Sequence, residues 1–176
     1  MSKGIQFLMK KNKIDVIMGT AKIKKSGKID VKLADGTSKE YIAKHTILAT
    51  GARSRELPNL PQDGKKIIGY RQAMSLSKQP KSLVVVGSGA IGVEFAYFYN
   101  AIGTKVTIVE FMDRIVPVED EEVSKQLEKS LKKAGIEILT KSEVQSVDTS
   151  GELSKVSIKT AKGIEVIEAE TVLSAV

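Results

Sequence analysis

The chain has 176 residues, of which 41% are hydrophobic, and its formal net charge is +7 at pH 7. This length accommodates one domain, or one domain and part of a second. No apolar run approaches the ~20 residues that a membrane helix needs, and the absence of cysteine excludes disulfides, thiolate metal ligands and a redox dithiol. Because the N-terminal stretch also lacks the apolar segment of a signal peptide, we expect a cytoplasmic protein that binds neither membrane nor metal.

Positive charge is concentrated in the first third of the chain. Residues 1–55 carry eleven Lys and two Arg against four acidic residues, a balance of +9, whereas residues 56–176 carry fifteen basic and seventeen acidic residues, a balance of −2. A basic segment can bind nucleic acid, but Tyr41 is the one aromatic residue near the lysine-rich stretch, so no platform for base stacking is predicted. We expect no nucleic-acid partner and interpret the asymmetry as a boundary near residue 55.

Residues 1–55 are expected to form a small β-meander. Their hydrophobic pattern predicts the end of an amphipathic helix followed by short strands, and Asp35-Gly36 between two strands is a strong hairpin signal. The predicted elements are a helix over 3–12, strands over 15–23, 29–33 and 40–42, and a buried strand over 45–50. A meander of this size buries little apolar area by itself, so we expect it to pack on another part of the protein.

The stretch 56–80 is expected to be a linker with one helical turn at 71–77, because it is mixed in polarity and holds three of the four prolines. From residue 81 the pattern changes, and the run 82–86 is continuously apolar, as in a strand buried on both faces. The next predicted elements are helices over 90–101 and 119–134, strands over 105–110 and 136–140, a β-meander over 144–168 and a last strand over 171–176. The buried stripe of the second helix is predicted to be Val123, Leu127, Leu131 and Ala134. This order predicts a Rossmann-like α/β fold with a parallel sheet.

The segment Gly87-Ser88-Gly89-Ala90-Ile91-Gly92 lies between the first strand and the first helix of this domain. In that context G-x-G-x-x-G is the fingerprint of a dinucleotide-binding turn, with the pyrophosphate on the helix N-terminus. Gly87 allows the tight turn, Gly89 lets the backbone approach the pyrophosphate, and Gly92 lets the helix pack closely on the strand. Glu110, eighteen residues after Gly92, is expected to accept hydrogen bonds from both hydroxyls of the adenine ribose.

The same carboxylate indicates NAD rather than NADP. A 2′-phosphate beside Glu110 would bring like charges into contact, and an NADP site would favour arginines directly after the second strand. Phe111 and Met112 occupy those positions. Arg114 follows closely enough to leave NADP open as an alternative.

Four segments resemble one group of flavoproteins. The stretch 87–94, which ends Ile-Gly-Val-Glu, resembles the flavin disulfide oxidoreductases that contain two dinucleotide folds, and the Ala-Thr-Gly-Ala-Arg stretch at 49–53 is similar to their second flavin-contacting motif. The stretches 109–117 and 4–19 are similar to the dihydrolipoamide dehydrogenases in particular. The resemblance covers essentially the whole chain.

The resemblance implies two sets of cofactor contacts. Glu94 would lie near the nicotinamide ring, and the backbone of Val144 would meet the adenine. The implied NAD contacts are Gly87, Ser88, Gly89, Ala90, Ile91, Gly92, Val93, Glu94, Glu110 and Val144. The implied FAD contacts, in the complete protein, are Gly19, Thr50, Gly51 and Ala52.

The resemblance also implies an activity for a protein longer than this chain. Dihydrolipoamide dehydrogenases oxidise dihydrolipoamide through a cysteine pair and FAD, transfer a hydride to NAD⁺, form homodimers and serve lipoyl-carrying 2-oxo acid dehydrogenase complexes. This chain has no cysteine, a single glycine fingerprint where the family has two, and one histidine, His45, that does not match the family's acid–base residue. We therefore expect a fragment that is inactive alone, without a catalytic residue of its own. Residues 1–55 would be the C-terminal part of the first FAD-domain segment, 56–80 a linker and 81–176 the NAD-binding domain.

Two other functions fit the same residues. The chain would also suit the NAD domain of another FAD-dependent NAD(P)H oxidoreductase, of the ferredoxin or rubredoxin reductase type. The second alternative is a non-catalytic module that senses NAD, although the stretch 49–52 has no evident role without a flavin. A Cys-x4-Cys segment beside a first glycine fingerprint, encoded upstream of Met1, would favour the disulfide oxidoreductases.

Overall fold

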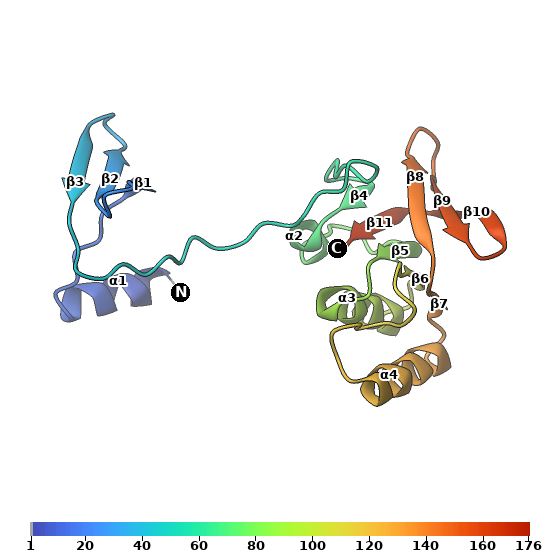
Figure 1. Cartoon of the computed structure of the whole chain (residues 1–176). Coiled ribbons are helices and arrows are strands. Elements are labelled where there is room, and N and C mark those ends of the chain that lie inside the picture. Colours follow the sequence, from blue (N-terminus) through green and yellow to red (C-terminus); the bar gives the residue numbers. More distant parts are fainter. Residues whose placement is uncertain (1) are drawn as a thin grey trace. The chain divides into compact units, whose positions relative to one another are not determined.

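Residues 2–176 are described by a computed structural model, in which the chain divides into two units, Met1–Gly51 and Ala52–Val176 (Figure 1). The first unit begins with helix α1 (Ser2–Lys11) and continues into an antiparallel sheet of order β1-β2-β3. Its strands are β1 (Gly19–Ile23), β2 (Ile29–Leu33) and β3 (Ser38–Tyr41). The expected hairpin joins β2 to β3, with Gly36 at a φ of +85°.

Little of the first unit is buried. Among residues 2–51, Val31 is the one hydrophobic side chain below a tenth exposed, whereas Phe7 on α1 is 64% exposed. Lys24 bridges Asp30 at 2.8 Å and Glu40 at 3.0 Å across the sheet. Such exposed ion pairs contribute little to stability, so the unit has almost no core of its own.

The buried strand expected over residues 45–50 is not formed, and that prediction is wrong. The segment has no regular secondary structure, and Ile47 and Leu48 are 91% and 71% exposed. An apolar run becomes a buried strand only where neighbouring strands pair with its backbone and other layers cover both of its faces. The three short strands of the first unit supply neither.

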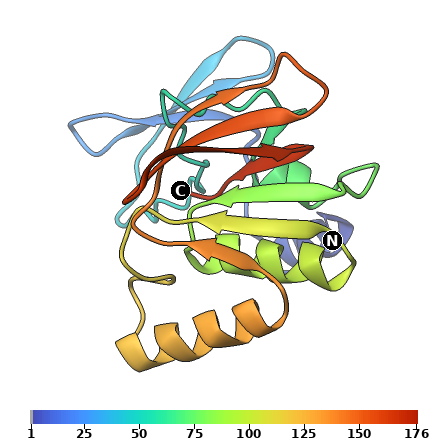
Figure 2. The same cartoon turned by 90° about the vertical axis from the view of Figure 1, so that its right-hand side faces the viewer.

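The second unit is a three-layer α/β structure. Its central sheet is parallel, and the strand order is β4 (Ile67–Ile68), β11 (Thr171–Ser174), β5 (Ser82–Val86), β6 (Lys105–Val109) and β7 (Glu137–Leu139). Helices α3 (Ala90–Ala101) and α4 (Glu121–Lys133) lie on one side of this sheet (Figure 2). The antiparallel sheet of β8 (Glu143–Asp148), β9 (Ser154–Thr160) and β10 (Gly163–Ala169) lies on the other. The predicted α/β fold with a parallel sheet and a β-meander is confirmed.

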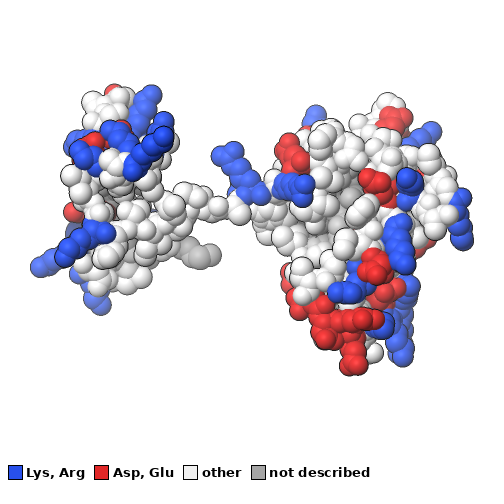
Figure 3. All heavy atoms as spheres, viewed as in Figure 1, with Lys and Arg blue, Asp and Glu red and all other residues white. Residues whose placement is uncertain are grey.

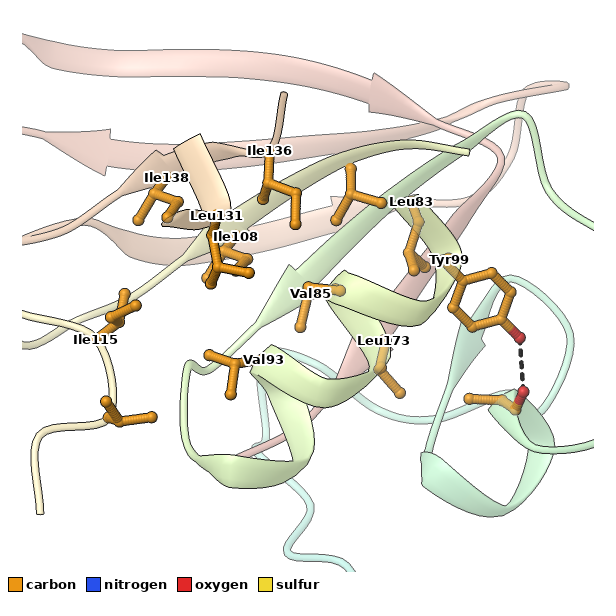
Figure 4. Close-up of a cluster of buried hydrophobic side chains, with 14 of the residues drawn as sticks. Leu83, Val85, Val93, Tyr99, Ile108, Ile115, Leu131, Ile136, Ile138 and Leu173 are labelled. Atoms are coloured by element: carbon orange, nitrogen blue, oxygen red, sulfur yellow. Dashed lines mark hydrogen bonds between the residues drawn. The ribbon is translucent and has the colours of Figure 1, made fainter. Parts of the chain in front are cut away.

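The continuous apolar run of β5 is explained by burial on both faces. Leu83 and Val85 point to the helices, where they join a cluster with Val93 and Ile108 (Figure 4). Their neighbours Val84 and Val86 point to the antiparallel sheet and join a second cluster. Because successive side chains of a strand alternate between faces, a strand with two covered faces needs an apolar residue at every position.

A short helix, α2 (Tyr70–Ala73), is tied to the helix-side cluster by one buried hydrogen bond. The Tyr99 hydroxyl donates to the Ala73 carbonyl oxygen at 2.6 Å (Figure 4). Tyr99 is 3% exposed, and its burial raises the pKa of the phenol. The phenol therefore stays a donor over the whole neutral range.

We expect Tyr99→Phe to lower the free energy of unfolding by about 1–2 kcal/mol, because it leaves the Ala73 carbonyl without its buried donor and retains the ring. The matched control is Tyr97→Phe, since Tyr97 lies on the same helix and is 60% exposed. Urea denaturation of both variants measures the difference. Equal stability of the two variants would show that water replaces the lost donor.

The stretch 56–80, expected to be a linker, contributes to the core of the second unit. Leu60 is completely buried in the cluster on the antiparallel-sheet side, and β4 pairs with β11. The helical turn expected at 71–77 corresponds to α2, which ends earlier, at Ala73. The edge strand in this proline-rich stretch could not be recognised in the sequence, because only Ile67 and Ile68 enter the sheet. A two-residue strand is too short to produce an alternating pattern.

The loop before β4 is organised by one carboxylate. Asp63 Oδ1 accepts hydrogen bonds from the backbone N–H groups of Lys65, Lys66 and Ile67 at 2.7, 2.8 and 3.0 Å. Partial burial raises the pKa of Asp63, but the three backbone donors together outweigh it and leave the pKa below its ordinary value. The ionised carboxylate thus stabilises the folded loop.

We expect Asp63→Ala to lower the free energy of unfolding at pH 7 by about 1 kcal/mol, since an exposed carboxylate is partly screened by water. The folded-state pKa is depressed, so this contribution is present above the unfolded-state pKa and is lost as the pH falls through the folded-state value. The difference between wild type and variant should shrink below about pH 4. Urea titrations at several pH values test this, with the exposed Asp113→Ala as control. A difference that stays constant down to pH 2 would contradict the assignment to charge.

Helix α4 is slightly shorter than the expected range 119–134, and its buried side differs from the expected stripe. Asp120 caps the helix by accepting from the Glu122 N–H at 2.8 Å. Leu131 is buried and Leu127 partly so, whereas Val123 is 54% exposed and Ala134 is also exposed. The predicted stripe is therefore wrong at two of its four positions. Ser124 is buried in place of Val123, because its hydroxyl donates to the Ile115 carbonyl oxygen at 2.7 Å.

Candidate functional site

The turn from β5 into α3 has the geometry that its first glycine predicts. Gly87 adopts a φ of +98°, in the region that residues with side chains rarely enter. A Cβ at this position would lie 2.6 Å from the carbonyl oxygen of Ala175, which follows β11. The turn is thus compressed against the neighbouring strand and accepts only glycine without a backbone shift.

The other two glycines differ from each other in their surroundings. A Cβ at Gly92 would lie 2.1 Å from the Gly87 carbonyl oxygen, so the helix touches the turn through bare backbone. A Cβ at Gly89 would meet no protein atom within 4 Å. Packing therefore explains Gly87 and Gly92, whereas no contact within the chain requires a glycine at 89.

Gly89 borders a pocket of ≈ 520 Å³ at the start of α3. This helix begins at Ala90, and the first N–H groups of a helix have no acceptor within it. The dipole of a helix adds partial positive charge at the same end. Two arginines and a tyrosine also line the pocket: Arg53, Arg55 and Tyr70. The hollow therefore offers donors and positive charge to an anion.

Glu110, directly after β6, is buried beside this turn. It is 6% exposed, and its Oε2 accepts from both the N–H and the hydroxyl of Ser88, at 2.8 and 2.6 Å. Its Oε1 accepts from the Met112 N–H at 2.7 Å. The structure thus brings Glu110 and the glycine turn together, as the sequence predicted. The hydrogen bonds from Ser88 were not predicted.

The start of the β-meander is held next to Glu110. The Ser142 N–H donates to the Glu110 carbonyl oxygen at 2.9 Å, and the Lys141 N–H donates to the Met112 carbonyl oxygen at 2.8 Å. Val144 follows two residues later, with its side chain buried and its carbonyl oxygen 2.7 Å from the Asn59 amide nitrogen. A smaller pocket of ≈ 260 Å³ lies here, bordered by Phe111, Lys141 and Glu143.

The remaining candidates of the helix divide into exposed and buried side chains. Ala90, Ile91 and Glu94 are exposed, and no ion pair of Glu94 is found among residues 2–176. Val93 is 8% exposed and packs in the helix-side cluster. Its side chain therefore serves the core, and only its backbone can face a ligand.

The residues proposed for a flavin lie in the first unit or at its boundary. Gly19 begins β1, where a Cβ would lie 2.5 Å from the Lys32 carbonyl oxygen, so close pairing of β1 with β2 accounts for this glycine. Thr50 and Ala52 are exposed. Gly51 has a φ of +78° and an open position for a Cβ. Packing thus explains Gly19 and leaves the open backbone at Gly51 unexplained.

Comparison with known proteins decides the family. Residues 1–176, the whole chain, match the family model described as pyridine nucleotide-disulphide oxidoreductase. The chain belongs to the pyridine nucleotide-disulphide oxidoreductase family. This membership agrees with the resemblance to flavin disulfide oxidoreductases that its motifs show.

Two solved structures and one curated relative place the chain within the pyridine nucleotide-disulphide oxidoreductases. It is 42% identical over 191 residues to a dihydrolipoyl dehydrogenase of Rhizobium etli, and the match covers 100% of this chain and 40% of the relative. This similarity confirms the resemblance seen in the sequence. LpdA of Mycobacterium tuberculosis has a TM-score of 0.87 at 30% identity, over 99% of this chain and 39% of that one. A ferredoxin reductase of Rhodopseudomonas palustris has a TM-score of 0.78 at 26% identity, over 97% and 43%. The chain thus spans about two fifths of the length of these proteins.

The loop that follows β6 contains Arg114, the arginine that left NADP open. One guanidinium nitrogen of Arg114 donates to the Pro117 carbonyl oxygen at 3.1 Å, and its Nε is buried without a partner among the described residues. A hydrogen bond from Lys125 lowers the pKa of Glu121, and the charge of Arg114 lowers it further. This side chain is therefore bonded to its own loop, close to the start of α4, where acidic residues gather (Figure 3).

Several residues of the site carried no signal in the sequence. Asn59 reaches Val144 of the meander, and Ser142 reaches Glu110, only through tertiary contacts between residues far apart in the chain. Tyr70 lines the pocket from the stretch 56–80, which was expected to be a linker, and Arg53 and Arg55 line it from the end of the predicted segment 1–55. The excess of Lys and Arg in residues 1–55 was visible in the composition, but nothing in a single sequence related it to the glycine turn. No three His, Cys, Asp or Glu side chains among residues 2–176 gather as a metal site, and no helix there is long and apolar enough to cross a bilayer.

Proposed function

We propose that the second unit is the NAD(H)-binding domain of a dihydrolipoyl dehydrogenase. The observation that carries this is the contrast between three glycines in one turn. Gly87 and Gly92 are explained by packing, but Gly89 faces open space beside the start of a helix. A glycine that no protein atom requires, placed where backbone donors converge, is suited to a pyrophosphate.

The other residues of the site have separate tasks in this proposal. Glu110 accepts from the adenine ribose, and its charge disfavours a 2′-phosphate. The pocket beside Phe111 and Glu143 receives the adenine, next to the backbone of Val144. Glu94 lies one turn into α3 and is exposed, so it places a negative charge towards the nicotinamide end. Arg53 and Arg55, which line the larger pocket, add positive charge near the pyrophosphate.

In the whole protein the proposed reaction is the oxidation of dihydrolipoamide with reduction of NAD⁺. FAD, when bound, supplies the electron transfer from the cysteine pair to the nicotinamide. Thr50, Gly51, Ala52 and the backbone of Gly19 are the residues of this chain proposed to contact it, and the open backbone position of Gly51 leaves room for such a contact. The proposed partners of the whole protein are a second copy and a lipoyl-carrying 2-oxo acid dehydrogenase complex.

The chain of 176 residues supplies only the acceptor site in this proposal. It has no cysteine to form the redox pair. We therefore expect NAD⁺ binding without lipoamide turnover. NAD⁺-linked oxidation of dihydrolipoamide by this chain would contradict the proposal.

Calorimetric titration of the chain with NAD⁺, NADH and NADP⁺ tests the proposed site. We expect NAD⁺ and NADH to bind and NADP⁺ to bind at least tenfold more weakly, because a 2′-phosphate would lie against Glu110. Absence of NAD⁺ and NADH binding at millimolar concentration would overturn the proposal. Tighter binding of NADP⁺ would overturn the role of Glu110.

A second candidate function is the NAD(P)H domain of a ferredoxin reductase. The similarity to the Rhodopseudomonas palustris enzyme, at a TM-score of 0.78, supports it. That class passes electrons to a protein partner and needs no cysteine pair. The gene sequence upstream of Met1 distinguishes the two, since a Cys-x4-Cys segment beside a first glycine fingerprint supports a disulfide oxidoreductase.

A further inference from the structure

Ser88 connects three parts of the candidate site. Its side chain and backbone are completely buried in the glycine turn. Its N–H and hydroxyl donate to Glu110 at the end of β6, and its carbonyl oxygen accepts from the Val116 N–H at 2.9 Å in the loop before α4. A movement of Glu110 would therefore break two bonds to the residue that also shapes the turn.

The hydrogen bonds of Glu110 leave it little capacity for a ligand. A carboxylate has about four acceptor positions, two on each oxygen. Ser88 fills both positions on Oε2, and Met112 fills one on Oε1. One position, on Oε1, is left for the ribose of a bound dinucleotide, although a ribose presents two adjacent hydroxyls.

We propose that Ser88 is a positioning residue that restricts Glu110 to one hydroxyl of the adenosine ribose. This inference rests on the proposed binding of NAD(H) and deepens it. The N–H and the hydroxyl of Ser88 together occupy both acceptor positions of Oε2, so only Oε1 is presented to the nucleotide. The contacts of the turn and of the ribose are thereby coupled through one side chain.

The proposal predicts how two modified nucleotides bind. The 2′-deoxy and 3′-deoxy forms of NAD⁺, altered in the adenosine ribose, each lack one hydroxyl. In the wild-type chain, one of the two analogues should bind about tenfold more weakly than NAD⁺, equivalent to about 1.4 kcal/mol, and the other within about twofold. In Ser88→Ala the hydroxyl bond to Oε2 is lost while the two backbone bonds remain, so a second acceptor position becomes free for the other ribose hydroxyl, and the contrast between the two analogues should fall below about threefold.

The contrast between the analogues is measured within each variant by calorimetry with the whole chain. Partial unfolding weakens the binding of both analogues equally and leaves the ratio of their dissociation constants unchanged. A merely structural role of Ser88 therefore would not produce the expected change in that ratio. Glu110→Gln serves as the second arm of a double-mutant cycle. In that background, removal of the Ser88 hydroxyl should not change the ratio further.

Each outcome decides the proposal. Equal losses of affinity for both analogues in the wild type would overturn the proposal, since the ribose hydroxyls would then displace Ser88 from the Glu110 carboxylate. A contrast that survives in Ser88→Ala would also overturn it. If Ser88→Ala does not fold, Ser88→Cys replaces it, because a thiol is of similar size and a weak donor. Failure of unmodified NAD⁺ to bind the wild-type chain would instead remove the proposed function, and this inference with it.

Discussion

Gly89→Ala is expected to abolish most of the affinity for NAD⁺ without destabilising the fold. A Cβ at Gly89 meets no protein atom within 4 Å, and the backbone there has a φ of −63°, which alanine adopts freely. The free energy of unfolding should change by less than about 0.5 kcal/mol. The added methyl group would occupy the space proposed for the pyrophosphate, so NAD⁺ should bind at least about tenfold more weakly.

Gly92→Ala is the matched comparison, because the same methyl group is added three residues later. Its Cβ would lie 2.1 Å from the Gly87 carbonyl oxygen, which is backbone and has no rotamer to change. We expect a loss of about 3 kcal/mol or more in the free energy of unfolding. Chemical denaturation and NAD⁺ titration of both variants separate the two glycines. An unchanged affinity of Gly89→Ala would contradict the proposed place of the pyrophosphate.

Glu110→Ala is expected to have the largest effect on cofactor choice. The variant removes the ribose acceptor and the charge that opposes a 2′-phosphate, so NAD⁺ should bind about tenfold or more weakly. The preference for NAD⁺ over NADP⁺ should fall at the same time. The free energy of unfolding should also fall by about 2 kcal/mol, since the buried donors of Ser88 and the partly buried N–H of Met112 lose their acceptor.

Titration of the Glu110 variant with both nucleotides measures the change in preference. Glu119→Gln is the control, because Glu119 is exposed in the loop before α4 and lies outside the proposed contacts. It changes the net charge by the same amount and should leave both affinities within about twofold. A variant at Glu110 that retains the full preference for NAD⁺ would show that another residue excludes the phosphate.

Most of the second unit was predictable because the hydrophobic pattern of each segment matches the burial that the segment has in the folded unit. The run 82–86 reads as a strand covered on both faces, and β5 occupies those residues and is covered on both faces. The helix expected over 90–101 begins and ends at those residues, since Gly89 opens it and Gly103, at a φ of +98°, follows it. The glycine turn and Glu110 were predictable for the same reason, because their spacing follows from one strand–helix–strand unit.

The incorrect predictions occurred where packing partners decide the structure. The run 45–50 has the composition of a buried strand, yet its neighbours in the described chain cover neither of its faces. On α4, Ser124 rather than Val123 faces the core because its hydroxyl finds the Ile115 carbonyl oxygen. The bonds from Ser88 to Glu110 were equally invisible, since hydrogen-bond partners twenty-two residues apart leave no periodic pattern.

The strand order of the central sheet delays its assembly. β11, formed by residues 171–174, lies between β4 and β5, whose residues are made about a hundred positions earlier. Until β11 emerges during synthesis, β5 has one unpaired edge and β4 has no partner at all. Non-local pairing of this kind slows folding, and exposed strand edges invite association between chains. A nascent chain of this protein therefore exposes these strand edges until residue 174 has left the ribosome.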